Sequence, residues 1–232
     1  MTVAAVILAA SPMAALADAD GAPAVRRIAD SAWAGGAMPV MVVAADPDGA
    51  VAAALATAEV TLLDPEPSQG GPAGRISGGM AGAAGLVAAT SAALVWPAEL
   101  AWADAETVTT LIEAHGEEPA AILRPSHDGV PGWPALIPLA VLDQLAREAP
   151  DRQPVEILAD LASDGIALRV VDTGDPGTTH DILVPHAMLP PFQGPPRPND
   201  PIEREWGAPA AAQSDDAPPA GPARPANPDP AR

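Results

Sequence analysis

Short, mostly apolar segments recur along the first 172 residues and are separated by segments with helical periodicity. The first, Val3–Ala9, has the composition of a strand that is buried on both faces of a sheet. Similar runs follow at Pro39–Ala45, Val60–Leu63, Ala92–Trp96, Ala120–Pro125, Pro134–Pro138 and Ala167–Asp172. Strands that alternate with helices build parallel βαβ units. The pattern therefore predicts an α/β fold, a three-layer sandwich with a mainly parallel central sheet.

Helical periodicity fills the intervals between these runs. One helix face is formed by Val25, Ile28, Ala29, Ala32 and Trp33, and Gly35 and Gly36 end this helix. Further helices are predicted after Asp48, over Ile76–Ala89, from Asp104 to Gly116, over Leu139–Ala149 and over Pro154–Ser163. Asp48 and Asp104 are expected to cap their helices. Pro134–Pro138 is expected at an edge of the sheet, because proline cannot donate to a strand ladder.

The N-terminal apolar run also resembles the hydrophobic region of a secretory signal, with a cleavage site at Ala15-Leu16-Ala17. No Lys or Arg precedes the run and Pro12 interrupts it, so we favour the buried strand. No run in the sequence reaches the length of a membrane span, about 18 apolar residues. We therefore expect a cytoplasmic protein with no membrane partner, and we keep a secreted domain as the alternative.

The absence of cysteine and lysine limits the chemistry open to the chain. Without cysteine there is no disulfide and no thiolate metal site. All 11 basic residues are arginines, so no lysine is available to bind phosphate or to act as a base. The formal net charge of −19 excludes nucleic acid from the expected partners, because phosphate backbones bind basic surfaces.

The composition changes near Leu189. Residues 191–232 contain 12 of the 30 prolines but only three large apolar side chains, Phe192, Ile202 and Trp206. A segment of this kind buries too little surface to offset its ordering entropy. We therefore predict one domain over residues 1–190 and a disordered Pro/Ala-rich tail over 191–232. The domain has 24 acidic residues and seven arginines, a net charge of −17, which repels anionic substrates unless a local site counters it.

Four stretches of the domain stand out in this order: "AAVILAAS", "QGGPAGRISGGM", "RPSHDGVPGWP" and "VVDTGDPGTTHDILVP". Together they resemble motifs of the MobA-like NTP transferase family, which includes cytidylyl- and guanylyltransferases that act on molybdopterin. The resemblance covers about residues 3–188. It implies a nucleotide-diphospho-sugar transferase-like fold and transfer of NMP from CTP or GTP to molybdopterin. The implied partners are an NTP and a molybdopterin-type acceptor.

The resemblance also implies which residues contact the nucleotide. Ala9 and Ala10 follow the first strand, and Gly71, Gly74 and Arg75 lie in the family's second loop and at the start of the next helix. Arg75 is well placed for an anion, because the free N–H groups of a helix start attract negative charge.

Three acidic residues fall at positions that matter in the family. Asp64 lies near the place where the guanylyltransferase branch has an Asp that faces the base, but a turn residue ahead of Pro65 is the interpretation we favour. Glu99 stands where the family has a metal-binding Asp, and Asp181 remains from its closing motif. The resemblance implies that Glu99 and Asp181 hold Mg²⁺, although Glu is longer than Asp and Mg²⁺ is strict about octahedral geometry.

The first loop departs from the family pattern. Only ten residues separate Ala10 from Gly21, and they contain no Gly, Arg or Lys but do contain Asp18 and Asp20. The phosphate-binding loop is thus eroded, and we expect weak NTP binding or none. The alternative function is a catalytically inactive module that keeps the fold and binds a protein partner, for example in molybdoenzyme maturation.

The remaining polar and aromatic candidates have simpler explanations. His115 at a helix C-terminus is expected to cap that helix, and His180 beside Asp181 is a weak metal candidate. Arg26 and Arg27 are expected to pair with nearby acids, namely Asp18, Asp20 and Asp30. Four tryptophans are expected to pack in the core or at its rim rather than to stack on a base: Trp33, Trp96, Trp102 and Trp133.

Overall fold

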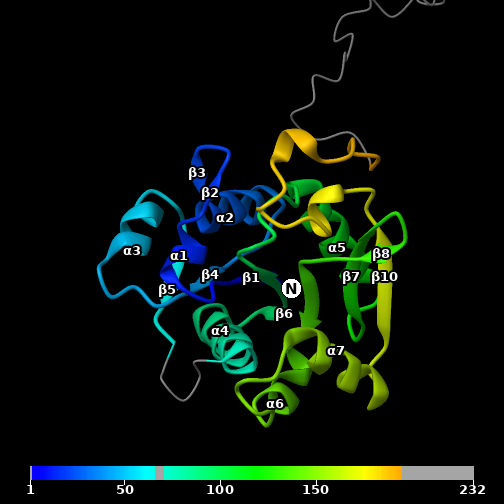
Figure 1. Ribbon diagram of the computed structural model, residues 1–232. Helices are drawn as coiled ribbons and strands as arrows, with labels where there is room; N and C mark the ends of the chain where they lie inside the picture. The colour runs from blue at the N-terminus through cyan, green and yellow to red at the C-terminus, as the bar shows by residue number, and fades with distance from the viewer. Residues whose placement is uncertain (1, 66–70, 195–232) are drawn as a thin grey trace, which may run out of the picture. The chain divides into compact units, whose positions relative to one another are not determined.

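The computed structural model describes residues 2–65 and 71–194, in which an eight-stranded sheet is covered by helices on both faces (Figure 1). The strand order is β10-β7-β9-β6-β1-β4-β5, and β8 pairs with β7. The strands are β1 (Thr2–Leu8), β4 (Val40–Val43), β5 (Thr61–Leu63), β6 (Thr90–Pro97), β7 (Ile122–His127), β8 (Val130–Pro131), β9 (Ala135–Pro138) and β10 (Leu168–Asp172). Pairs that include β8 or β9 are antiparallel, and the other pairs in this sheet are parallel. The predicted three-layer α/β fold is confirmed.

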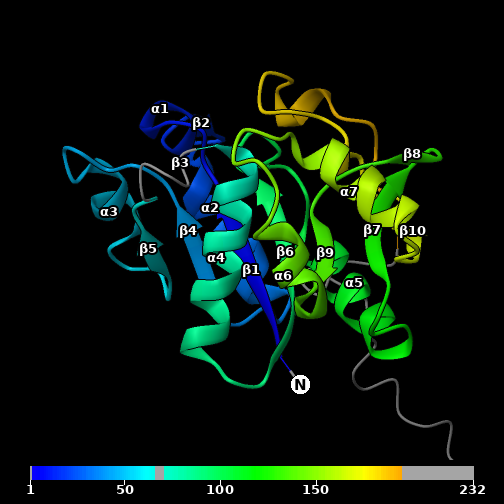
Figure 2. The same cartoon turned by 90° about the horizontal axis from the view of Figure 1, so that it is seen from below.

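Helices form the two outer layers (Figures 1 and 2). One face is covered by α2 (Ala24–Ala34) and α5 (Ala105–Glu117), and the other by α4 (Pro72–Leu86), α6 (Leu142–Leu145) and α7 (Pro154–Ser163). The shorter elements are α1 (Pro12–Ala15), α3 (Ala50–Leu55), η2 (Leu139–Val141), η3 (Pro176–Thr178), η4 (His186–Met188) and the hairpin of β2 (Asp18–Ala19) with β3 (Ala22–Pro23).

The N-terminal apolar run is a central strand of the sheet, with β4 on one side and β6 on the other. Val3, Ala5 and Ile7 belong to the core beneath α2 and α5, whereas Ala4 and Val6 belong to the core beneath α4. All five are at most 4% exposed. Successive side chains of a strand point to opposite faces, so one apolar segment supplies both cores. The prediction of a buried strand is confirmed.

The predicted edge position of Pro134–Pro138 is wrong. β9 is buried along its whole length and lies between β6 and β7, antiparallel to both. Pro134 precedes the strand and Pro138 ends it. The residues between them keep their N–H groups, which allows the strand to pair inside the sheet.

Two helix details also differ from the prediction. Asp48 does not cap α3: the two carboxylate oxygens of Asp46 accept the backbone N–H groups of Val51 and Ala52, each at 2.9 Å. Trp33 does not join the buried face of α2 but is 50% exposed. It lies in the last turn, beyond a buried stripe that ends at Ala32.

No helix among the described residues is long and apolar enough to cross a membrane. The predicted tail over residues 191–232 lies outside the described residues from position 195 onward. Within the described part, the Gln193 N–H donates to the carbonyl of Gly174 at 2.9 Å. Contacts with the domain therefore continue a few residues past the predicted boundary at 190.

Candidate functional site

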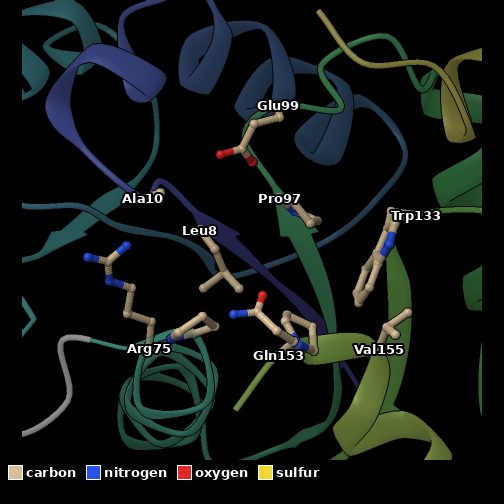
Figure 3. A pocket seen from close by; sticks show the side chains of 10 residues that line it. Leu8, Ala10, Arg75, Pro97, Glu99, Trp133, Gln153 and Val155 are labelled. Carbon is tan, nitrogen blue, oxygen red and sulfur yellow. The ribbon is translucent and has the colours of Figure 1, made fainter. Parts of the chain in front are cut away.

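A cavity of about 500 Å³ opens at the carboxyl ends of β1 and β6 (Figure 3). Ligands of open α/β sheets bind at the carboxyl ends of the strands. The cavity is lined by Leu8, Ala10, Pro72, Arg75, Pro97, Glu99, Trp133, Gln153, Pro154 and Val155. This set includes three of the eight site residues that the sequence singles out, namely Ala10, Arg75 and Glu99.

Arg75 enters the cavity from the first turn of α4 (Figure 3). Its Nη1 donates to the carbonyl of Ala9 at 2.8 Å, which fixes the guanidinium beside the end of β1. Its Nε is buried and has no hydrogen-bond partner within the described residues. A guanidinium carries five N–H donors, so this side chain keeps donor capacity for a ligand.

Gly71 and Gly74 lie at the start of α4 but not in the cavity lining. The Gly74 N–H donates to the carbonyl of Pro150 at 3.4 Å. A Cβ atom at Gly71 would lie 2.0 Å from the same oxygen. The loop between α6 and α7 therefore covers this part of the helix start. Ala9 is also outside the lining and contributes only the carbonyl that holds Arg75.

The segment after β1 is structured in a way that the sequence analysis missed. The hydroxyl of Ser11 accepts the Ala14 N–H at 3.2 Å and so caps α1. The chain then enters the β2–β3 hairpin, where the Gly21 N–H donates to Asp18 at 3.1 Å. A helix and a hairpin therefore follow β1, where the family resemblance implies a phosphate loop.

The two arginines that follow this hairpin do not line the cavity. Arg26 pairs with Asp30 at 2.9 Å, as predicted. Arg27 does not pair with the predicted acids, because its Nε donates to the carbonyl of Ala101 at 3.1 Å and its guanidinium lies 5.0 Å from the ring centroid of Trp102.

Glu99 and Asp181 lie on neighbouring segments. Glu99 is exposed at the cavity, and its backbone carbonyl accepts the Ile182 N–H at 2.8 Å. Asp181 is exposed but does not line the cavity, and its Oδ1 accepts the Leu183 N–H at 3.0 Å. Within the described residues, no group of three or more His, Cys, Asp or Glu side chains has the arrangement of a metal site.

Asp64 lies exposed, just after β5 and outside the cavity lining. Its position at the carboxyl end of a parallel strand is the same edge of the sheet that carries the cavity. The structure does not bring its side chain together with Arg75 or Glu99 around that cavity.

Sequence reasoning missed the α7 side of the cavity. Gln153, Pro154 and Val155 line it from the start of α7, and Trp133 lines it from the segment between β8 and β9. The sequence does indicate where α7 starts, because proline is common in the first turn of a helix. Nothing local indicated that this helix start would meet the ends of β1 and β6, because that depends on the place of β9 in the sheet.

A buried carboxylate, also missed, organises the loop after β10. Asp175 is 1% exposed, and its Oδ2 accepts the Asp104 N–H at 2.9 Å and the Thr107 hydroxyl at 2.7 Å. Its Oδ1 accepts the Gly177 N–H at 2.8 Å. The carbonyl of Thr178 in turn accepts the Trp133 N–H at 2.8 Å. Asp175 therefore joins the start of α5 to the loop that supports Trp133.

Trp102 links the N-terminal hairpin region to the closing segment. Its indole N–H donates to the carbonyls of Asp181 and Val184 at 3.1 and 3.0 Å. The ring stacks on His186 at 5.1 Å between centroids, and His186 contacts Asp20 at 3.1 Å. Trp102, predicted to pack in the core or at its rim, is 3% exposed, and it also fixes the backbone that carries Asp181.

The expected role of His115 is wrong. Its side chain is 0% exposed, and its Nε2 lies 3.1 Å from the hydroxyl of Ser91. Burial lowers the pKa of His115, so the ring is held neutral rather than as the cation that a helix C-terminus favours. His180 also has a local explanation, because its Nδ1–H donates to the carbonyl of Pro176 at 2.8 Å.

Comparison with known proteins finds a matching family and solved structures of similar fold. Residues 13–165 match the family model of the MobA-like NTP transferase domain. No curated protein sequence matches the chain.

Solved structures are similar in fold. A 4-diphosphocytidyl-2C-methyl-D-erythritol synthase from Anaerococcus prevotii has a TM-score of 0.60 at 11% identity, over 80% of this chain and 97% of that one. Rv0371c from Mycobacterium tuberculosis, in complex with manganese, has a TM-score of 0.57 at 16% identity, over 78% and 94%. A CMP:2-keto-3-deoxy-manno-octonic acid synthetase with CTP has a TM-score of 0.52 at 15% identity, over 75% and 90%.

Proposed function

Since the chain belongs to the MobA-like NTP transferase domain family, we propose that its cavity binds a magnesium nucleoside triphosphate, CTP or GTP, and transfers the NMP to a molybdopterin-type acceptor. The observation that carries this proposal is the joint presence of Arg75 and Glu99 in one cavity at the carboxyl ends of β1 and β6. Arg75 would donate to phosphate oxygens, and Ala10 would lie beside them. The structural neighbours that are cytidylyltransferases support the nucleotide class.

Glu99 fits the role of a magnesium ligand. Mg²⁺ is commonly held by one or two carboxylates and completed by substrate phosphates and water. Glu99 is exposed at the cavity, and Asp181 is tied to the same region through the bond from Ile182 to Glu99. When bound there, Mg²⁺ would offset the negative charge of the phosphates. Glu99 is therefore the primary ligand in this proposal and Asp181 the secondary one.

The proposed reaction is a substitution at the α-phosphorus. An oxygen of the acceptor forms a bond to that phosphorus, and the bond from phosphorus to the bridging oxygen breaks. Pyrophosphate leaves with the electron pair, and the proton of the acceptor passes to solvent. Arg75 acts by binding and orienting the phosphate oxygens as their charge shifts.

Weak nucleotide binding follows from the segment after β1. A helix and an acidic hairpin stand where the family resemblance implies a loop that supplies glycines, an Arg and a Lys to the triphosphate. Charge-assisted hydrogen bonds contribute about 1.5–3 kcal/mol each. The loss of two such bonds would weaken binding by roughly two to four powers of ten.

An inactive binding module is the second candidate. Two contacts support it. The Ser11 hydroxyl accepts the Ala14 N–H, and the Pro150 carbonyl accepts the Gly74 N–H, so neither N–H group is left to bind a phosphate. In this case the fold would serve a protein partner, such as a molybdoenzyme under maturation.

Calorimetric titration of the full chain with CTP and GTP, with and without Mg²⁺, separates the candidates. The proposal predicts magnesium-dependent millimolar binding, weakened about tenfold or more by Arg75→Met and by Glu99→Gln. Arg169→Met is the matched control, because Arg169 pairs with exposed Glu118 at 3.1 Å and does not line the cavity. Absence of binding, or binding that neither cavity variant changes, would leave the inactive module as the function.

A further inference from the structure

The loop between α6 and α7, residues 146–153, lies against the first turn of α4. Pro72 and Arg75 of that turn line the cavity. Gln153 and Pro154, where the loop runs into α7, line it too. In the view of Figure 3, Gln153 lies between Arg75 and Val155. The loop and the helix start are therefore both part of the cavity wall, and the position of the loop affects the shape of the cavity.

The tip of this loop covers the N-terminus of α4. The Pro150 carbonyl accepts the Gly74 N–H at 3.4 Å, and a Cβ atom at Gly71 would collide with the same oxygen. No side chain caps this helix, and Pro72 in its first turn has no N–H group to donate. The N–H groups that remain free at a helix start attract negative charge. The backbone oxygen of Pro150 therefore stands where an oxygen of a phosphate would be bound.

Arg75 shows that this turn has unused capacity for an anion. Its Nη1 is bonded to the carbonyl of Ala9, but its Nε is buried and has no hydrogen-bond partner within the described residues. A buried donor without a partner is unfavourable, and the single long bond from Gly74 to Pro150 does not remedy it. A phosphate carries more negative charge than a carbonyl and would accept from both Gly74 and the guanidinium. The helix start is therefore better satisfied by a phosphate than by the loop.

Arg152 holds the tip in this position, because it pairs with acidic residues on both sides of it. Its Nη1 lies 3.3 Å from Glu148, which precedes the tip. Its Nε lies 3.3 Å from Glu156 and its Nη2 lies 2.6 Å from Asp160, both in α7. Arg152 itself does not line the cavity. The four side chains are 28–55% exposed, and ion pairs of such exposure contribute little each, so the loop can open at small cost.

We propose that the α6–α7 loop is an autoinhibitory gate on the cavity, with the Pro150 carbonyl in the place of a phosphate oxygen and Arg152 as the positioning residue that keeps the gate closed. This inference rests on the proposed function and adds the regulation of that site: the loop leaves the start of α4 when a triphosphate binds there. The bond from Gly74 to Pro150 is then a reversible block. The measured association constant is the intrinsic one multiplied by the fraction of molecules with an open gate.

Variants of the ion pairs test the gate on the full chain, by calorimetry with Mg·CTP and Mg·GTP. Arg152→Gln removes three pairs, each worth up to about fivefold in the opening equilibrium, so the affinity should rise by about threefold or more. Asp160→Asn removes one of them and should give a smaller rise. Arg169→Gln is the matched control, because it removes a surface ion pair outside the cavity lining and should leave the affinity unchanged. General damage to the fold would lower the affinity instead.

Hydrogen exchange of the backbone amides of residues 146–153 gives a second readout. These amides should exchange faster in Arg152→Gln than in the wild-type chain, because the gate is open for more of the time. Saturation with Mg·CTP should also speed their exchange in the wild-type chain, whereas a ligand that binds beside a fixed loop would slow it. Unchanged nucleotide affinity in both Arg152→Gln and Asp160→Asn, or slower exchange of the loop with Mg·CTP, would overturn the inference.

Titration with inorganic pyrophosphate separates failure of the gate from failure of the proposed function. Magnesium-dependent NTP binding that Arg75→Met weakens and Arg152→Gln leaves unchanged would retain the nucleotide site and reject the gate. Pyrophosphate binding that Arg152→Gln strengthens, without NTP binding by either protein, would retain the gate and reject nucleotidyl transfer. No binding of either ligand to either protein would reject both.

Discussion

His115 illustrates, at the scale of one residue, how burial outweighs position along a helix. A helix C-terminus favours a protonated histidine by up to about 2 kcal/mol in partly buried positions. Removal from water acts in the opposite direction and lowers the pKa of His115 from its ordinary value of 6.5. The helix position was visible in the sequence, but the β6 residue Ser91 that meets the ring was not.

Acid should destabilise the fold through His115. Below pH 6.5 the unfolded chain binds the proton and the folded one resists it, so the free energy of unfolding falls as the pH drops. The His115→Gln variant should show a smaller fall between neutral pH and pH 5 in urea titrations. Equal slopes for the two proteins would show that His115 does not contribute to acid sensitivity.

Asp175 is the buried charge on which the loop after β10 depends. Its carboxylate accepts three hydrogen bonds and is 1% exposed. Replacement by Asn puts an amide N–H against these donors, and loss of one bond to a charged group costs about 1.5–3 kcal/mol. Asp175→Asn should lower the free energy of unfolding by this amount. Asp172→Asn, at an exposed carboxylate, is the control and should change it little.

At the scale of elements, α4 and β1 approach closely because Gly79 lacks a side chain. A Cβ atom there would lie 2.4 Å from Val6 Cγ1, whereas one at Gly85 of the same helix would meet nothing within 4 Å. Gly79→Ala should destabilise the protein by about 1–3 kcal/mol through overpacking. Gly85→Ala should instead stabilise it by about 0.4–1 kcal/mol, by reducing the entropy of the unfolded chain. Thermal unfolding of the two variants makes the comparison, and equal effects would contradict this account of the packing.

Strands and helices with a clear local sequence pattern could be predicted. The place of an element in the fold could not be predicted where it depends on contacts between distant segments. The seven predicted strands were identifiable because short apolar runs are typical of strands, although β10 at the edge of the sheet is largely exposed. The antiparallel, interior place of β9 depends on its pairing with β6 and β7, which is not written in its own residues. The same applies to the site. Arg75 and Glu99 could be found because they lie at positions that the family resemblance indicates. Gln153 could not, because it lines the cavity only through the position of α7.

At the scale of the whole molecule, strong acidity coexists with one cationic side chain in the cavity lining. The formal net charge is −19, and Arg75 is the only basic residue that lines the cavity in the described part of the chain. A distributed negative field repels a triphosphate. The fold of a nucleotidyltransferase family is thus retained around a site with little positive charge to hold phosphate.

We propose that the fold keeps the cavity at the ends of β1 and β6 and that the segment after β1 limits nucleotide binding. Replacement of residues 11–20 by a glycine-rich loop with one Arg and one Lys tests it most directly, with Mg·CTP and Mg·GTP affinities measured by calorimetry. We expect affinity to rise by roughly two to four powers of ten, and Glu99→Gln in the same background to reverse much of the gain. A folded loop variant with unchanged affinity would contradict the account and show that the rest of the cleft has also lost its nucleotide site.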